Sequence, residues 1–229
     1  MSKTQTRDYR YERKFLVEGL DAGQVRTMVR RHPAMFYEPY PPRVVNNLYL
    51  DTEEMDNYYA NLGGADERCK VRVRWYGELF GAIASPVLEF KIKSGLVGTK
   101  QSYTFPAFRL DESFSQCLFQ DLVQGANLPA PVRLHLRTLN VVLCNNYQRW
   151  YYATKDGRYR VTVDADMAYY RVRRFGNRFI QHIVDDSHII VEMKYEKPFE
   201  LQADRVAGFF PFRVTRNSKY VTGIECVYL

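Results

Sequence analysis

Basic side chains recur at every second position of segment 69–75, as Lys70, Arg72 and Arg74. The positions between them are apolar. If the segment is a β-strand, alternate side chains point to opposite faces, so the three cations share one face. Guanidinium groups can bind phosphate oxygens through paired N–H donors, and a lysine adds a point charge. The pattern therefore predicts a strand that presents a cationic face to an anionic ligand.

Four other segments repeat this alternation and add carboxylates. Their charged faces carry Glu12 with Lys14, Glu89 with Lys91 and Lys93, Arg158 with Arg160 and Asp164, and Glu192 with Lys194. Two like charges about 4 Å apart repel by roughly 4 kcal/mol at an effective dielectric constant of 20, so crowded cations favour a bound anion. Unless the glutamates only pair with these cations, they suggest a divalent metal, because Mg²⁺ and Mn²⁺ prefer carboxylate together with phosphate oxygens.

The same alternation is also typical of an ordinary sheet with one solvated face. For a single strand the solvated face is the favoured interpretation, since charged side chains are mostly exposed. Five such strands with mixed charges shift the balance toward a sheet curled into a barrel. Its interior would be charged, and helices would cover its apolar outside.

The elements that must position these side chains follow from hydrophobic periodicity and turn residues. We expect strands over residues 9–17, 44–50, 69–76, 87–93, 101–105, 139–153, 158–164, 169–175, 178–184, 189–196 and 220–228. We expect helices over residues 20–31, 52–61, 113–123 and 202–210, the first with Asp21 as its N-cap. About ten strands with three or four inserted helices indicate a largely antiparallel α+β fold.

Composition narrows the classes of function. The 229-residue chain has a net charge of +7 and a pI near 9.2, which favours an anionic partner. Nucleic acid is not expected, because the aromatic residues fall mainly on the strand faces opposite the basic ones. No linker or change in composition divides the chain, so we predict one domain over residues 1–229.

The location of the protein is predicted from what its sequence lacks. The four cysteines form no CxxC pair and are too sparse for a disulfide framework, which predicts reduced thiols in the cytoplasm. No apolar run resembles a secretion signal or a membrane span. Association with a membrane would then require a membrane-protein partner.

Eight motifs in order resemble one family, the VTC domain. They cover residues 11–15, 47–52, 68–77, 89–93, 147–149, 160–164, 191–195 and 218–220, and the resemblance extends over about 9–229. VTC domains are triphosphate tunnel metalloenzymes, related to CYTH-type phosphatases. The resemblance implies a closed, mainly antiparallel β-barrel with a charged lumen and helices packed outside.

The resemblance implies a polyphosphate polymerase, which transfers the γ-phosphoryl group of ATP to a growing polyphosphate chain. It implies a divalent metal, usually Mn²⁺, with Mg²⁺ as the alternative. The residues matched to catalysis are Lys14, Arg72, Arg74, Lys91, Arg149 and Arg160. Those matched to phosphate or nucleotide binding are Lys70, Lys100, Lys194, Ser218 and Lys219. The candidate metal ligands are Glu192, Glu12 and Glu89.

Two other functions stay open at this point. CYTH-type phosphatases carry an ExExK pattern, and Arg10 stands at its first glutamate position here, which favours the polymerase branch. A hydrolase of tripolyphosphate or nucleoside triphosphates in the same tunnel is the first alternative. The second is a non-catalytic polyphosphate-binding module, which Glu192 disfavours because a pure anion binder gains nothing from a carboxylate there.

A further basic cluster lies outside these motifs. Arg171, Arg173, Arg174 and Arg178 surround a predicted hairpin turn at 176–177. A solvated edge that resists aggregation is the favoured interpretation. The alternative is a landing site for the polyanionic product.

Overall fold

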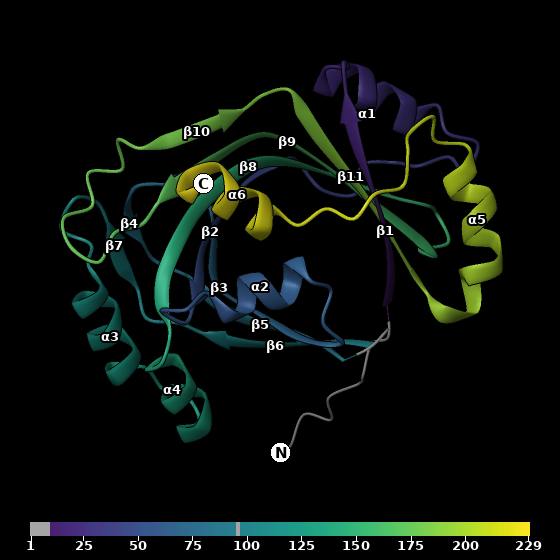
Figure 1. Cartoon of the computed structure of the whole chain (residues 1–229). Helices are drawn as coiled ribbons and strands as arrows, with labels where there is room; N and C mark the ends of the chain where they lie inside the picture. The colour runs from purple at the N-terminus through teal and green to yellow at the C-terminus, as the bar shows by residue number, and fades with distance from the viewer. Residues whose placement is uncertain (1–9, 95–96) are drawn as a thin grey trace.

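The computed structural model describes residues 10–94 and 97–229, and its centre is a curled antiparallel sheet (Figure 1). Residue 9, where the first predicted strand begins, lies outside this range. The sheet has the order β1-β11-β9-β8-β2-β3-β5-β6, and β10 adds to β9. Its strands are β1 (Arg10–Glu18), β2 (Arg43–Asp51), β3 (Glu67–Tyr76), β5 (Val87–Ser94), β6 (Val97–Thr104), β8 (Asn140–Ala153), β9 (Tyr159–Arg171), β10 (His182–Asp185) and β11 (His188–Glu196). A separate ribbon pairs β4 (Gly81–Ile83) with β7 (Phe108–Leu110).

The predicted α+β class and antiparallel pairing are confirmed, but the predicted closed barrel is not. Among the described residues, β1 and β6 stand at the two ends of the strand order and do not pair. Side chains reach across the opening instead, and Lys91 Nζ of β5 lies 3.0 Å from Glu12 Oε1 of β1. The sheet is therefore a half-barrel whose edges are joined by long charged side chains and not by a backbone ladder.

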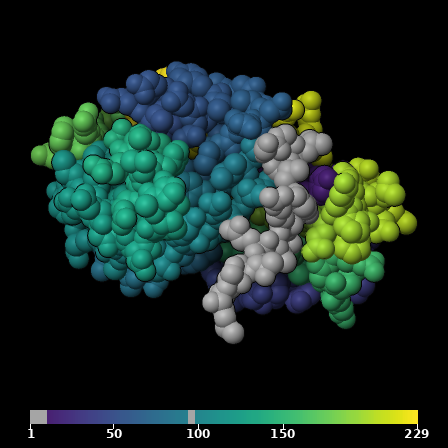
Figure 2. Space-filling view, turned by 90° about the horizontal axis from the view of Figure 1, so that it is seen from below, coloured from purple at the N-terminus to yellow at the C-terminus, as the bar shows by residue number. Residues whose placement is uncertain are grey.

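Helices cover both sides of this half-barrel. They are α1 (Ala22–Arg30), α2 (Asp56–Leu62), α3 (Gln116–Gly125), α4 (Ala130–Leu136), α5 (Glu200–Gly208) and α6 (Lys219–Tyr228), and a 3₁₀ turn spans Lys197–Phe199. One core packs α1 and α5 on the convex face, and a second packs α3 and α4 there. Figure 2 shows these two groups of helices on opposite sides of the molecule. No helix in the described part of the chain is long and apolar enough to cross a membrane.

A third core lies on the concave face, which corrects the prediction that every helix packs outside. Tyr220 and Ile224 of α6 are buried there with Tyr58 of α2 and with strand residues such as Tyr49 and Tyr147. Figure 1 shows α2 and α6 under the arch of the sheet. One end of the concave face is therefore apolar and filled by helices, which leaves the other end for charged side chains.

A bulge in β9 changes which residues face the concave side. The pairing with β8 shifts between Asn146 and Gln148, and Asp166 adopts a left-handed φ of 53°. One extra residue inverts the side-chain alternation. Asp164 and Tyr169 both face the concave side as a result, one in the charged half and one in the apolar half. The strands predicted over 158–164 and 169–175 are thus mostly one strand, β9.

The segment predicted as a closing strand over 220–228 is helix α6. Its N-cap is Ser218, whose hydroxyl accepts a hydrogen bond from the Val221 N–H at 3.3 Å. Tyr220, Gly223 and Ile224 are the buried positions, and this i, i+3, i+4 spacing is helical. A Cβ added to Gly223 would lie 2.5 Å from Leu143 Cδ2, so the glycine lets α6 approach the sheet closely.

Asp51, at the end of β2, anchors both concave-side helices. It is fully buried and accepts hydrogen bonds from the backbone N–H groups of Thr52, Asn57 and Tyr58 at 2.8–2.9 Å. The Tyr220 hydroxyl of α6 donates to the same carboxylate. One carboxylate thus ties the start of α2 and the first turn of α6 to the sheet.

Replacing this anchor should destabilise the fold. We expect Asp51→Ala to lower the free energy of unfolding by about 3 kcal/mol or more, because three backbone N–H donors, of which that of Tyr58 is buried, lose a fully buried charged acceptor. Tyr220→Phe removes one hydrogen bond and should cost about 1 kcal/mol. Urea unfolding followed by circular dichroism measures both. An Asp51→Ala variant as stable as the unmodified chain would contradict this role.

Candidate functional site

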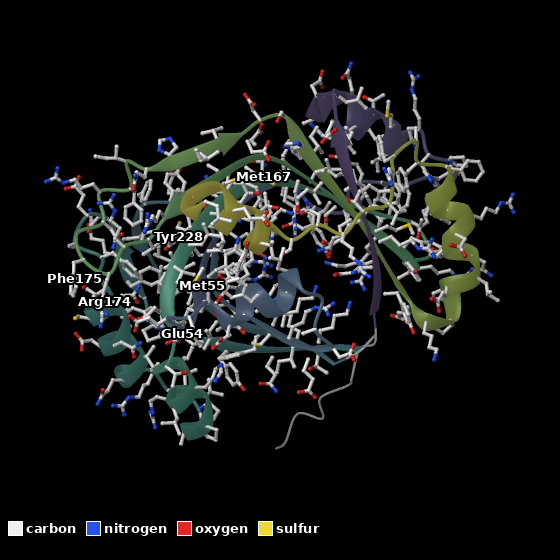
Figure 3. The ribbon with its side chains drawn as sticks, viewed as in Figure 1. Glu54, Met55, Met167, Arg174, Phe175 and Tyr228 are labelled. Atoms are coloured by element: carbon white, nitrogen blue, oxygen red, sulfur yellow. The ribbon has the colours of Figure 1, made fainter. Side chains whose placement is uncertain are left out.

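Charged side chains from seven strands and from the start of α6 meet on the concave face beyond the apolar half. Figure 3 shows side-chain nitrogen and oxygen atoms under the arch of the sheet. All but one of the side chains proposed from the sequence take part in the ion pairs and hydrogen bonds of this group. The exception is Arg160, which is exposed on β9 and lies opposite Lys194 in the strand register.

One cluster centres on Glu89 of β5. Its Oε2 lies 2.6 Å from Arg72 Nη2 and 3.7 Å from Arg74 Nη1, and Lys100 of β6 pairs with Oε1. Burial alone would raise the pKa of Glu89, but Arg72, Arg74 and Lys100 outweigh it and lower that pKa to about 2. Glu89 therefore stays ionised and holds two guanidinium groups side by side.

A second cluster centres on Asp164 of β9, which is fully buried. Arg149 of β8 donates two hydrogen bonds to its carboxylate, at 2.6 and 2.7 Å, and Lys219 of α6 donates one at 2.6 Å. Burial opposes ionisation of Asp164, but Arg149 and Lys219 lower its pKa to about 2. Both cations also lie over the ring of Tyr147, at 5.2 and 4.7 Å from its centroid.

The third cluster brings two carboxylates to one ammonium group. Lys14 Nζ lies 3.7 Å from Glu12 Oε1 and 3.7 Å from Glu192 Oε2, and it donates to the Asn217 carbonyl at 3.1 Å. Lys194 Nζ pairs with Glu192 Oε1 at 2.5 Å. Burial raises the pKa of Glu192, but Lys194 and Lys14 hold it well below its usual range.

The third cluster is where a divalent metal fits best. Glu12 and Glu192 converge on one point, and two carboxylates with phosphate oxygens and water make a typical Mg²⁺ or Mn²⁺ environment. Glu89 is already paired with three cations and does not join them. Residues 10–94 and 97–229 contain no group of three or more His, Cys, Asp or Glu side chains that could bind a metal alone. A metal here would therefore depend on the anionic ligand for its remaining oxygens.

Lys70 links β3 to the start of α6. Its Nζ donates to Ser218 Oγ at 2.8 Å. Burial and, to a smaller extent, the nearby cations Lys14 and Lys91 together lower the pKa of Lys70 to about 7. Lys70 is therefore the cation of this site whose charge changes near neutral pH.

The model of the VTC domain family matches residues 9–228. The chain belongs to the VTC domain family. This confirms the resemblance seen in the sequence.

Two solved structures share the fold of this chain. A putative adenylate cyclase from Vibrio parahaemolyticus has a TM-score of 0.51 at 10% identity, and the match covers 93% of this chain and 96% of that one. A putative adenylyl cyclase from Hippeastrum, described as having a dominant triphosphatase activity, has a TM-score of 0.51 at 14% identity, with 96% and 98% covered. No curated protein matches the chain.

The VTC domain has supporting residues that the sequence interpretation missed. Asn47 Oδ1 accepts from Arg74 Nε at 3.0 Å, and Asn47 Nδ2 donates to Asn145 Oδ1 at 2.9 Å. The Tyr147 hydroxyl lies 3.4 Å from Arg74 Nη2. Burial raises the pKa of Tyr147, but Arg149 and Arg74 lower it to about 8. In β2, the alternation of side chains places Asn47 on the concave face. That alternation is the signal that could have identified it.

Acid should unfold the VTC domain partly through Glu89 and Asp164. Their folded-state pKa values of about 2 lie below the ordinary 4.5 and 3.8, so their stabilisation is complete above about pH 4.5 and is lost as the pH falls toward 2. Asp164 accounts for about 2 kcal/mol of this loss. We expect Asp164→Asn to be less stable at pH 7 and to show a shallower decline in urea unfolding between pH 4.5 and 2.5. If the free energy of unfolding declined equally in the unmodified chain and in Asp164→Asn, Asp164 would not be a group whose protonation destabilises the fold.

The affinity of the concave face for an anion should depend on pH through Lys70. As the pH falls from 8.5 to 6, Lys70 becomes protonated, so tripolyphosphate should bind more tightly. Lys70→Met should remove this part of the pH dependence, while Lys155→Met, at an exposed turn, should keep it. Isothermal titration calorimetry at several pH values measures this. Identical pH profiles for the chain and Lys70→Met would rule out Lys70 as the titrating group.

Proposed function

We propose that this VTC domain is a metal-dependent polyphosphate polymerase that acts as one domain on ATP and polyphosphate. The observation that carries the proposal is that the carboxylates on the concave face are held in their ionised form. Glu89 has a pKa of about 2, and that of Glu192 lies well below its usual range, so both are weak bases. A terminal phosphate oxygen is already ionised and needs no base, whereas water does. Such a site favours a phosphate acceptor over water.

In this reaction an oxygen of the polyphosphate end attacks the γ-phosphorus of ATP. The bond between that phosphorus and the β–γ bridging oxygen breaks, and ADP leaves with the bonding electrons. Charge spreads over the equatorial oxygens in the transition state, so catalysis consists mainly of positioning and electrostatics. Arg72 and Arg74, held by Glu89 and Asn47, offer paired N–H donors to these oxygens.

The other cations divide between the two sides of the ligand. On the β1 and β5 side, Lys14 and Lys91 balance phosphate charge beside Glu12 and Glu192. On the α6 side, the phosphate contacts come from Arg149, Lys219, Ser218 and Lys70. The remaining cations are more exposed and would meet the incoming or departing polyphosphate chain at the rim of the concave face. They are Arg160, Lys100 and the half-buried Lys194.

Glu12 and Glu192 would hold the divalent metal, Mn²⁺ or Mg²⁺, together with phosphate oxygens. When bound, the metal would offset negative charge on the phosphates. Lys14, which lies between the two carboxylates, would then turn to phosphate oxygens. Unpaired Cys69, Cys117, Cys144 and Cys226 suit a cytoplasmic location, where ATP is also available.

A tripolyphosphate or nucleoside triphosphate hydrolase is the second candidate. The Hippeastrum protein with this fold is described as a triphosphatase. Water and phosphate compete for the same phosphorus atom, so one site can support either reaction. Incubation with ATP and Mn²⁺, with polyphosphate staining on a gel and a parallel assay of free phosphate, separates the two. A ladder of chains with ADP supports the polymerase, and free phosphate without chains supports the hydrolase.

Two substitutions test the site itself. We expect Arg72→Ala and Glu192→Gln each to reduce turnover at least about 100-fold, because each removes a charged contact to phosphate or metal. Arg137→Ala, at an exposed arginine after α4, is the matched control and should retain activity. Thermal unfolding confirms that each variant is folded. Full activity in both Arg72→Ala and Glu192→Gln would exclude the concave face as the active site.

A further inference from the structure

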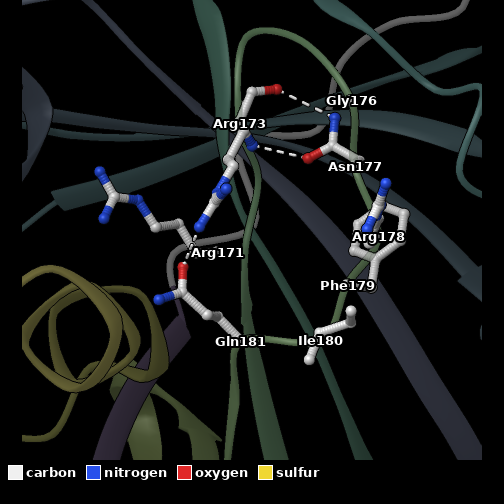
Figure 4. A pocket seen from close by; sticks show the side chains of 8 residues that line it. All are labelled: Arg171, Arg173, Gly176, Asn177, Arg178, Phe179, Ile180 and Gln181. Carbon is white, nitrogen blue, oxygen red and sulfur yellow. Dashed lines mark hydrogen bonds between the residues drawn. The ribbon is translucent and has the colours of Figure 1, made fainter.

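A second cationic cluster lies on the connection between β9 and β10. Arg171, Arg173 and Arg178 line a pocket of about 350 Å³ together with Gln181, and we call this the arginine pocket (Figure 4). Residues 171–184 include no acidic residue. This cluster belongs to none of the motifs that match the family.

The pocket is shaped by a buried amide. Asn177 is 1% exposed, and its Oδ1 accepts from the Arg173 N–H at 2.6 Å. Its Nδ2 donates to the carbonyls of Arg173 at 2.9 Å and Phe114 at 2.8 Å. Arg173 Nη2 in turn donates to Gln181 Oε1 at 2.6 Å, as the dashed lines in Figure 4 show for the contacts of Arg173. The loop is thus held in place before any ligand binds.

The arginines of the pocket lack the carboxylate partners that neutralise the concave face. Nearby Arg174 lies 3.9 Å from Glu53, but no ion pair joins Arg171, Arg173 or Arg178 to a carboxylate among the described side chains. The Arg171 guanidinium lies over the Tyr228 ring instead, 4.4 Å from its centroid. Three uncompensated guanidinium groups around one concavity attract an anion with several phosphate oxygens.

Helix α6 connects this pocket to the candidate site. Its first residue, Lys219, pairs with Asp164, and its last residue, Tyr228, packs against Arg171. Ten helical residues span about 15 Å. Polyphosphate outgrows the candidate site as it lengthens, whereas tripolyphosphate does not. We propose, building on the proposed function, that the arginine pocket binds a second stretch of the polyphosphate chain.

An anionic lipid surface is the competing ligand. Phe175 and Ile180 beside the pocket are 69% and 72% exposed, and such side chains can enter a bilayer. A concave pocket lined by exposed arginines suits a flexible chain better than a flat headgroup layer. Vesicle binding must therefore be measured alongside polyphosphate binding.

The test replaces the three pocket arginines with glutamine, as Arg171→Gln, Arg173→Gln and Arg178→Gln together. We expect the Kd for long-chain polyphosphate to rise about tenfold and the Kd for tripolyphosphate to stay unchanged. The matched control, Arg31→Gln with Arg137→Gln and Arg205→Gln, removes the same charge from exposed sites elsewhere and should bind both ligands normally. Thermal unfolding verifies that both triple variants are folded.

Three results would overturn the inference. One is unchanged long-chain binding in the pocket variant, and another is an equal loss in the control. The third is loss of binding to phosphatidylserine vesicles with polyphosphate binding retained, which would assign the pocket to lipid. If the unmodified chain makes no polyphosphate but the pocket variant selectively loses long-chain binding, the proposed function fails and the pocket remains a polyphosphate site.

Discussion

The buried ion cluster of Asp164 with Arg149 and Lys219 is the interaction on which the site depends. A cation removed from water is costly unless a partner compensates it, and Asp164 compensates two cations from different elements. Because Lys219 begins α6, the same carboxylate that keeps Arg149 charged also fixes where that helix starts. Ser218, the N-cap of α6, is thereby held against Lys70. Asp164 thus connects the charged half of the concave face to α6, the helix that fills the apolar half.

Under the proposed function, the other carboxylates occupy the positions that phosphate oxygens would take. Glu89 holds Arg72 beside Arg74, and Glu12 and Glu192 face Lys14. Without these carboxylates, repulsion among the cations would have to be offset by the fold elsewhere. With them, an entering polyanion exchanges one set of ionic contacts for another. The cost of holding cations together is therefore met before the ligand arrives, which is the usual basis of electrostatic preorganisation.

The faces of the strands were predictable from sequence because side-chain alternation depends only on local geometry. The concave positions of Lys14, Arg72 and Glu192 follow from that rule alone. Features that depend on distant contacts were not predictable in this way. The aromatic segment 220–228 suggested a strand, but Gly223 packs against Leu143 and Tyr169 only as part of a helix. The bulge at Asp166 also depends on the partner strand, so alternation alone split β9 into two predicted strands.

In the part of the chain that the structure describes, the half-barrel stays open because side-chain contacts, and not backbone hydrogen bonds, join its two edges. Strand pairing would close β1 against β6 through many hydrogen bonds that could break only together. The contact seen instead, Lys91 with Glu12, is a half-exposed ion pair of the kind that contributes little to stability. A phosphate chain can displace that pair without disturbing any ladder, because Lys91 gains a new anionic partner when it releases Glu12. Glu12 then keeps Lys14 as its ion-pair partner beside Glu192, so under the proposed function the entry of the anion loosens one of the two contacts that hold Glu12.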